Sequence, residues 1–223
     1  NFRPEQEGAP SATTMDGQNS NFGTNYTTIH DATSGTGGLD AQTAGTIFSN
    51  GKVDANNFQI NRGHTLFNAS SIDKSDPINS ATLTLYSNGD TSDTDTACTD
   101  DATLVSTSPA SNIDLVNADY NQANFGSTDY MTGVVISSLP STDQTAKEFT
   151  LNASGRSFIE TAIDTLSGIV KFGWRVQGDR DNCTPNGFAN FGAYFSDQGG
   201  DVIEPKLVVD HGGAGKARRI LID

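Results

Sequence analysis

The feature that most constrains the fold is the alternation of apolar and polar side chains in the last third of the chain. In residues 169–177 the apolar side chains fall on every second position, at Val170, Phe172, Trp174 and Val176. Residues 189–196 show the same pattern, with Ala189, Phe191, Ala193 and Phe195. A period of two places alternate side chains on opposite faces of a strand. Both segments are therefore predicted to be antiparallel strands with one buried face and one face toward water.

Other parts of the chain predict further strands and one helix. Strands are expected at residues 26–29, 46–49, 52–55, 58–67, 79–86, 147–151 and 206–210. Asn50-Gly51 is typical of a hairpin turn, and Asn88-Gly89 is expected to end the strand before it. The helix is predicted over residues 154–166, with Ser157 and Glu160 as its capping box. These elements together predict an all-β fold, an antiparallel β-sandwich with one short helix.

The composition narrows the class of protein. Hydrophobic residues make up 34% of the 223 residues, charged residues make up 18%, and the net charge is −14. Abundant Asn, Thr, Ser and Gly are typical of a loop-rich extracellular β-protein rather than of a helical enzyme. The negative charge opposes contact with phosphates and anionic lipid, and no apolar run is long enough to span a bilayer. We expect neither a nucleic-acid partner nor membrane insertion.

The last residues differ from the body in composition. Residues 1–210 are predicted to form a single β-sandwich domain, and residues 211–223 a Gly-rich linker followed by a tail. The tail carries both basic and apolar side chains, namely Lys216, Arg218, Arg219, Ile220, Leu221 and Ile222. Such a tethered segment is expected to dock on a neighbouring subunit, or on a second copy of the chain, by pairing with a sheet edge. The alternative is a frayed terminus.

The two cysteines, Cys98 and Cys183, lie in Asp- and Asn-rich segments and match no zinc-binding spacing. We favour a disulfide between them, and two unrelated thiols are the alternative. A disulfide would bring together five carboxylates, those of Asp93, Asp95, Asp100, Asp179 and Asp181. Carboxylates at close range repel unless water or a cation separates them. Structural Ca²⁺ is one interpretation of this set, and a solvated acidic surface is the other.

Motifs for catalysis are weak in this sequence. There is no G-x-S-x-G motif, His64 falls in an expected strand and His211 in the expected linker, so a catalytic triad is not predicted. No Asp or Glu lies in an apolar stretch that would raise its pKa for sugar hydrolysis. The chain is therefore expected not to be an enzyme. Tyr86 and Tyr194 point outward by their phase and are candidates for stacking on a sugar.

Four segments, in this order, resemble the DNRLRE-type extracellular domain, a β-sandwich module of jelly-roll kind, so the resemblance implies a jelly-roll-like β-sandwich. Residues 19–24 (NSNFGT) resemble its early loop, 66–72 (LFNASSI) and 80–86 (SATLTLY) two of its strands, and 205–209 (PKLVV) its closing strand. Thr65 and Asn68 depart from the family pattern, and residues 31–58 have no counterpart in it. Members occur on secreted, cell-wall and bacteriophage surfaces, so the resemblance implies an extracellular location.

The function implied by this resemblance is that of a non-enzymatic structural or decorating subunit of an extracellular assembly. A bacteriophage virion protein is the favoured case, whether a capsid decoration or a tail or fibre component. The alternative is a secreted carbohydrate-binding or adhesive module. A shared fold does not by itself convey a ligand, so these remain expectations to be weighed against the site.

Overall fold

The computed structural model describes residue 4 and residues 14–39, 44–196 and 203–212. Its strands are β1 (Asp16–Gly23), β2 (Gly37–Leu39), β3 (Ala44–Lys52), β4 (Phe58–Asn68), β5 (Ile78–Asp93), β6 (Asp101–Ser106), β7 (Val134–Val135), β8 (Ala146–Thr150), β9 (Ile169–Val176), β10 (Phe188–Tyr194) and β11 (Lys206–His211). The helices are α1 (Tyr26–His30), α2 (Ala153–Thr165) and α3 (Gln177–Arg180), with 3-10 turns η1 (Asn117–Tyr120), η2 (Gln122–Asn124) and η3 (Ile136–Ser138).

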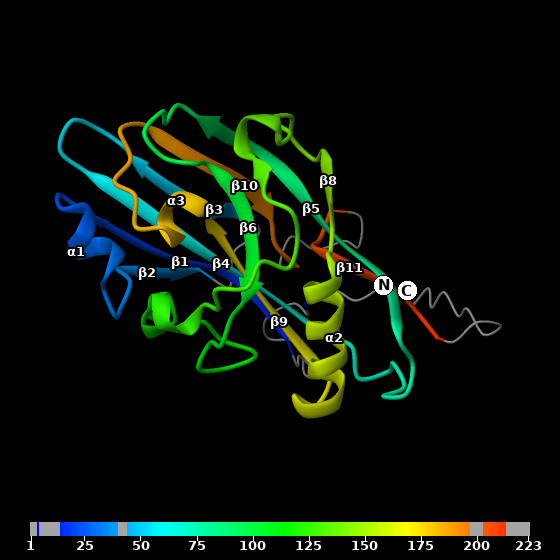
Figure 1. The fold of residues 1–223 in the computed structure, drawn as a ribbon. Coiled ribbons are helices and arrows are strands. Elements are labelled where there is room, and N and C mark those ends of the chain that lie inside the picture. The colour runs from blue at the N-terminus through cyan, green and yellow to red at the C-terminus, as the bar shows by residue number, and fades with distance from the viewer. Residues whose placement is uncertain (1–3, 5–13, 40–43, 197–202, 213–223) are drawn as a thin grey trace.

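All the strands join in one antiparallel sheet that curls over on itself. Its main order is β11-β5-β10-β3-β4-β9-β6-β7, with β1 along β4, β2 outside β1 and β8 along β5. The long strand β5 bends so that its first half pairs with β8 and β11 and its second half with β10. Helix α2 packs against β5 and β9, and Figure 1 shows it below β8 at one end of the curled sheet. The predicted all-β, antiparallel, sandwich-like fold with one sizeable helix is confirmed.

The core lies between the facing layers of this sheet. Eight side chains were predicted to point inward: four in β9, three in β10 and that of Phe195 just after β10. All eight are fully buried. The Trp174 ring stacks on Phe48 at 5.8 Å and meets Phe149 edge-on at 4.9 Å. Its indole N–H donates to the Thr65 hydroxyl at 3.1 Å, so the only polar group of the ring is paired inside the core.

The expectation of a wet outer face is wrong for β9. Arg175 is only 4% exposed, and Gly173 is covered by the Phe125 ring. The reason is a second layer of short elements, including α3 and the segment around η2, which packs on the outer side of this strand. Alternation identified the strand correctly, but a polar residue on the outer face turned out to be buried against this layer.

Two local predictions near the N-terminal half are wrong. Residues 26–29 belong to helix α1 because the Asn25 side chain accepts a hydrogen bond from the Thr28 N–H at 3.0 Å and caps the helix. The Asn50-Gly51 pair lies inside β3, and the hairpin turns later, where Val53 N–H donates to the Asn57 carbonyl at 2.9 Å. Gly51 is needed there because a Cβ would lie 2.2 Å from the Phe188 ring.

Two further boundaries differ from the prediction. Strand β5 runs through Asn88-Gly89 and bends there, with Gly89 at φ +86°. Helix α2 is capped by Asn152, whose side chain accepts from the Gly155 N–H at 3.0 Å. The predicted capping box does not form, because the Glu160 carboxylate accepts instead from the Ile78 N–H at 2.9 Å.

The chain stays in the fold slightly beyond the predicted domain end. His211 is the last residue of β11, is buried and lies 2.8 Å from the Asp76 carboxylate, so it is not part of a linker. Gly212 then donates its N–H to the Pro77 carbonyl at 3.1 Å. The predicted docking residues, from Lys216 to Ile222, lie outside the described residues.

Candidate functional site

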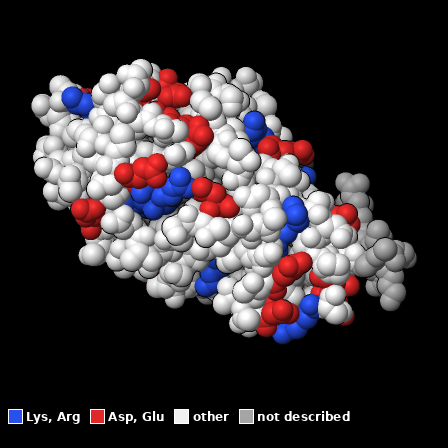
Figure 2. All heavy atoms as spheres, in the orientation of Figure 1, with Lys and Arg blue, Asp and Glu red and all other residues white. Residues whose placement is uncertain are grey.

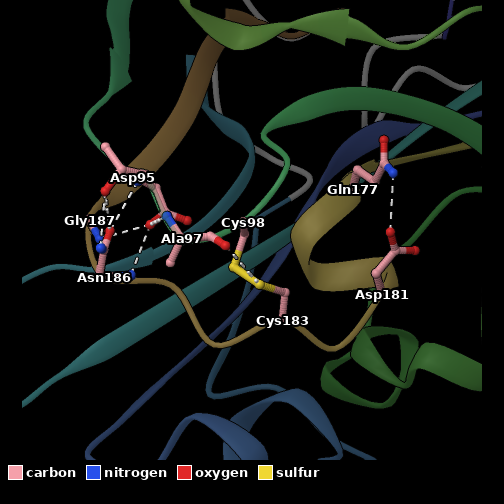
Figure 3. The surroundings of a disulfide bond; sticks show 9 residues. Asp95, Ala97, Cys98, Gln177, Asp181, Cys183, Asn186 and Gly187 are labelled. Atoms are coloured by element: carbon pink, nitrogen blue, oxygen red, sulfur yellow. Dashed lines mark hydrogen bonds between the residues drawn. A yellow bond between two sulfur atoms is a disulfide. The ribbon is translucent and has the colours of Figure 1, made fainter.

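The predicted disulfide is present. Cys98 and Cys183 are bonded, with 5.8 Å between their Cα atoms, and join two loops that are 85 residues apart in the sequence. Cys183 also donates its N–H to the Gly178 carbonyl at 2.9 Å. The bond therefore ties the loop after β5 directly to helix α3 (Figure 3).

On one side of the disulfide, Asp95 organises both loops. One carboxylate oxygen accepts from the Asn186 N–H at 2.8 Å, the Gly187 N–H at 3.1 Å and the Ala97 N–H at 3.1 Å (Figure 3). The other oxygen, Oδ2, is buried and has no hydrogen-bond partner in the structure. A carboxylate with three amide donors on one oxygen is a strong clamp, and its second oxygen remains available for another donor or a cation.

Asp100 is a second buried carboxylate near this clamp. It is 7% exposed, and its Oδ1 has no hydrogen-bond partner among the described residues. Burial first, and then the negative charges of Asp95, Asp93 and Asp101, raise the pKa of Asp100 to about 7. Near neutral pH this group therefore exchanges a proton readily, and a cation at the same place would compete with that proton.

On the other side of the disulfide lies a buried ionic cluster centred on Asp179. Arg62 donates to both carboxylate oxygens, at 2.7 and 3.0 Å, and Arg175 donates to one of them at 2.6 Å. The Asp179 and Arg62 side chains are fully buried and that of Arg175 is 5% exposed. Burial alone would raise the pKa of Asp179, but the charges of Arg175 and Arg62 outweigh it and hold that pKa well below its usual range.

The cluster joins five elements of the fold. The Arg62 guanidinium of β4 also donates to the Tyr120 carbonyl at 2.7 Å and to the His30 carbonyl at 3.0 Å, and lies 4.4 Å from the centre of the Tyr120 ring. The His30 Nε2 lies 2.8 Å from the Asp179 carbonyl and donates to it. One set of charged side chains thus holds together strands β4 and β9, helices α1 and α3 and the turn η1. The Nδ1 of the His30 ring lies 2.6 Å from the Asp31 carboxylate, so both nitrogens of this ring have partners within the protein.

The five carboxylates predicted as metal ligands do not form one group. Asp95 forms the clamp and Asp100 lies near it, whereas Asp93 accepts a hydrogen bond from the Ser137 N–H at 3.2 Å. Asp179 belongs to the arginine cluster, while Asp181 lies on the far side of the disulfide and accepts from Gln177 at 3.1 Å (Figure 3). Across the described residues, no three or more His, Cys, Asp or Glu side chains are grouped to hold a metal ion. The disulfide thus brings the loops together but directs their acids apart.

The two tyrosines predicted to stack on a sugar are partly exposed. Tyr86 pairs across the sheet with Ala146, and the Tyr194 hydroxyl donates to the Asp143 carboxylate at 2.7 Å. That hydrogen bond raises the pKa of Tyr194. The ring of Tyr194 is thereby fixed over the bend of β5.

The face drawn in Figure 2 is mainly uncharged. Figure 2 shows acidic and basic side chains in small separate groups between wide areas of other residues on the face drawn. No helix in the described part of the chain is long and apolar enough to cross a membrane.

No family model matches the chain, and a search of curated proteins finds no significant match. The resemblance to the DNRLRE-type domain thus stays a prediction, and the function has to be argued from the site itself.

The arginine cluster was missed by sequence reasoning. Alternation places Arg175 on the strand face that was expected to be exposed to water. Arg62 falls in the strand expected at residues 58–67, where its neighbours in the sequence give no sign of burial. One signal was available, because Arg175 and Asp179 are four residues apart at the end of a strand. The contribution of Arg62, 117 residues away from Asp179, depends on the pairing of β4 with β9 and has no local signal.

Proposed function

We propose that this protein is a structural subunit of an extracellular assembly and holds its neighbours by adding its C-terminal segment to the edge of their sheets. The observation that carries the proposal is the position of β11. It ends the strand order of the sheet, and within the described residues it pairs with β5 alone. An edge strand offers unpaired backbone N–H and C=O groups to an incoming strand.

The chemistry of the tail fits this edge. Residues 213–223 follow directly after β11, and they combine three basic side chains with the β-branched run around Leu221. A hollow of about 320 Å³ next to the edge is lined by Ser80, Thr82, Val208, Val209 and Asp210. The acidic Asp210 and the net charge of −14 favour a basic partner segment. A strand from a neighbouring copy satisfies both the backbone and the charge requirement.

The disulfide supports an extracellular setting, because such bonds persist in oxidising compartments. A secreted protein and the surface of a virion both meet this condition. The resemblance of residues 80–86 (SATLTLY), which form part of β5 beside β11, to a strand of the DNRLRE-type domain supports an extracellular assembly, and the acidic Asn- and Thr-rich body with its Gly-linked basic tail favours a bacteriophage particle.

The decisive experiment removes the tail and keeps the edge. A chain ending at Gly212 retains its hydrogen bond to Pro77 and should fold with an unchanged melting temperature, but it should sediment as a monomer. A second variant, Val208→Lys, places a charge at the edge and should also block assembly. Val53→Lys, at an exposed turn, is the matched control and should assemble normally. Assembly of the truncated chain would refute the proposal.

Structural Ca²⁺ at the clamp is a second proposal, favoured by the unpaired buried oxygens of Asp95 and Asp100. Hard cations prefer such carboxylate oxygens, with carbonyls and water completing the shell. Millimolar Ca²⁺ should raise the melting temperature relative to a chelator, and Asp100→Asn should remove this difference. An identical melting temperature with and without Ca²⁺ would exclude the site.

A further inference from the structure

Four residues on neighbouring strands form a transverse row at one end of the sheet. Phe22 of β1 is opposite Gln59 of β4, and Gln59 is opposite Gly51 of β3. Gly51 is in turn opposite Phe188 of β10. Residues directly opposite each other on neighbouring strands point to the same face of a sheet. Two aromatic rings therefore flank a glutamine and a glycine on a single surface.

Both rings are accessible to a ligand. Phe22 is 50% exposed, the largest exposure of an aromatic side chain among the described residues, and Phe188 is partly exposed. The Phe188 ring lies over Gly51, since a Cβ at Gly51 would be 2.2 Å from it. With strands about 4.8 Å apart, the β1 and β3 backbones lie about 10 Å from each other. The two rings are thus separated by a short, open stretch of sheet.

The polar groups between and beside the rings are uncharged and held in place. The Gln59 amide nitrogen donates to the Asn61 side chain at 3.0 Å, while its oxygen accepts no hydrogen bond in the part of the chain described. A hollow of about 390 Å³ at this end of β1 includes Phe22, but most of its lining, such as Asn21, Gly23 and Ile29, belongs to α1 and to the face of β1 that packs on α1, opposite to the row. None of the four residues of the row is charged, although the chain as a whole carries −14.

From this geometry we infer that the row from Phe22 across Gln59 to Phe188 binds a linear, uncharged oligosaccharide. The C–H face of a sugar ring stacks on an aromatic face, and its hydroxyls pair with amide and hydroxyl groups. Two rings separated by a glutamine suit a chain of sugars rather than a single one. The absence of charged residues from the row favours neutral over acidic sugars, because a polysaccharide carboxylate would find no cation in the row. The site is independent of the tail and of β11, and it goes beyond the assembly role proposed above.

Binding is tested with the intact chain against soluble neutral oligomers of glucose, mannose and xylose, with polygalacturonate as the acidic comparison. Calorimetry should detect at least one neutral oligomer, and Phe22→Ala should weaken it about tenfold. Gln59→Ala should weaken it as well. Ile113→Ala, which truncates another apolar side chain of 49% exposure, is the matched control and should bind as the unchanged protein does.

Three results would overturn the inference: no neutral oligomer binds, Phe22→Ala binds as tightly as Ile113→Ala, or polygalacturonate binds equally well. Melting temperatures of the variants separate a lost contact from a lost fold, because exposed positions change stability little. The chain ending at Gly212 should retain sugar binding even where it no longer assembles. Failure of the sugar site and failure of the tail proposal are therefore distinguishable.

Discussion

Breaking the arginine cluster should be the most damaging single substitution outside the apolar core. Arg62 is fully buried and makes two hydrogen bonds to the Asp179 carboxylate and one each to two backbone carbonyls. In Arg62→Met these carbonyls lose their donor, and the buried carboxylate is left with Arg175 alone. Removing one partner of a buried pair costs about 3–5 kcal/mol. With an unfolding slope of about 3 kcal/mol per molar urea, the midpoint should fall by about 1–2 M.

The matched control is the ion pair of Arg180 with Asp129, whose side chains are 19% and 43% exposed. Arg180→Met should cost less than about 1 kcal/mol, because water screens and replaces a partly exposed pair. Urea unfolding followed by tryptophan fluorescence reports both variants, since Trp174 is the single tryptophan and is fully buried. If Arg62→Met and Arg180→Met lower the midpoint equally, the cluster does not stabilise the fold in the way described. In Arg62→Met combined with Asp179→Asn the loss should be smaller than the sum of the two single losses, because the orphaned charge is gone.

Three further predictions concern other parts of the fold. Replacing both Cys98 and Cys183 by Ala opens a loop of 85 residues and should cost about 4–5 kcal/mol by loop entropy, which a urea titration measures; a loss under about 1 kcal/mol would contradict it. Burial first, and then the charge of Arg62, lower the pKa of His64 to about 3 from an ordinary 6.5, so the unfolded chain binds the proton more readily between these values. The stability that the neutral ring provides is therefore complete above pH 6.5 and lost as the pH falls toward 3, by up to about 1.4 kcal/mol per pH unit. His64→Gln should flatten this part of the stability profile, and an unchanged slope would show that other groups cause it. Asn152→Ala removes the cap of α2 and should cost about 1 kcal/mol in the same titration, whereas no loss would mean that the helix end is held by packing.

Local sequence patterns were sufficient to predict the strands that have one face in the core. Val170, Phe172 and Trp174 alternate with smaller or polar residues, and the two-residue period of a strand admits one inward set. The same reasoning failed at Asn50-Gly51 and at residues 26–29. At the first, the Phe188 ring from a distant strand fills the space above the glycine. At residues 26–29, the Asn25 side chain accepts a hydrogen bond from the Thr28 N–H, and a helix begins where the apolar spacing suited a strand.

For the candidate sites, too, part of the arrangement could be predicted from the sequence and part could not. Cysteine count and spacing were enough to predict the disulfide, because only two thiols were available to pair. They could not predict which acids would meet beside it, since Asp95 and Asp179 lie on opposite sides of the bond and face different partners. Nor could the sequence place Phe22 and Phe188 in one row, because three strand registers separate them.

The sequence by itself determined that the chain forms an antiparallel sheet with one apolar face in the core, since alternation is a property of neighbouring residues. Tertiary structure alone decided that Arg62, Arg175 and Asp179 would share one buried site. From the sequence alone, a charged residue in a strand is predicted to be exposed to solvent. These arginines are buried because another layer covers them, and that layer comes from segments more than a hundred residues apart. Only the folded chain can supply the opposite charge that makes such burial stable.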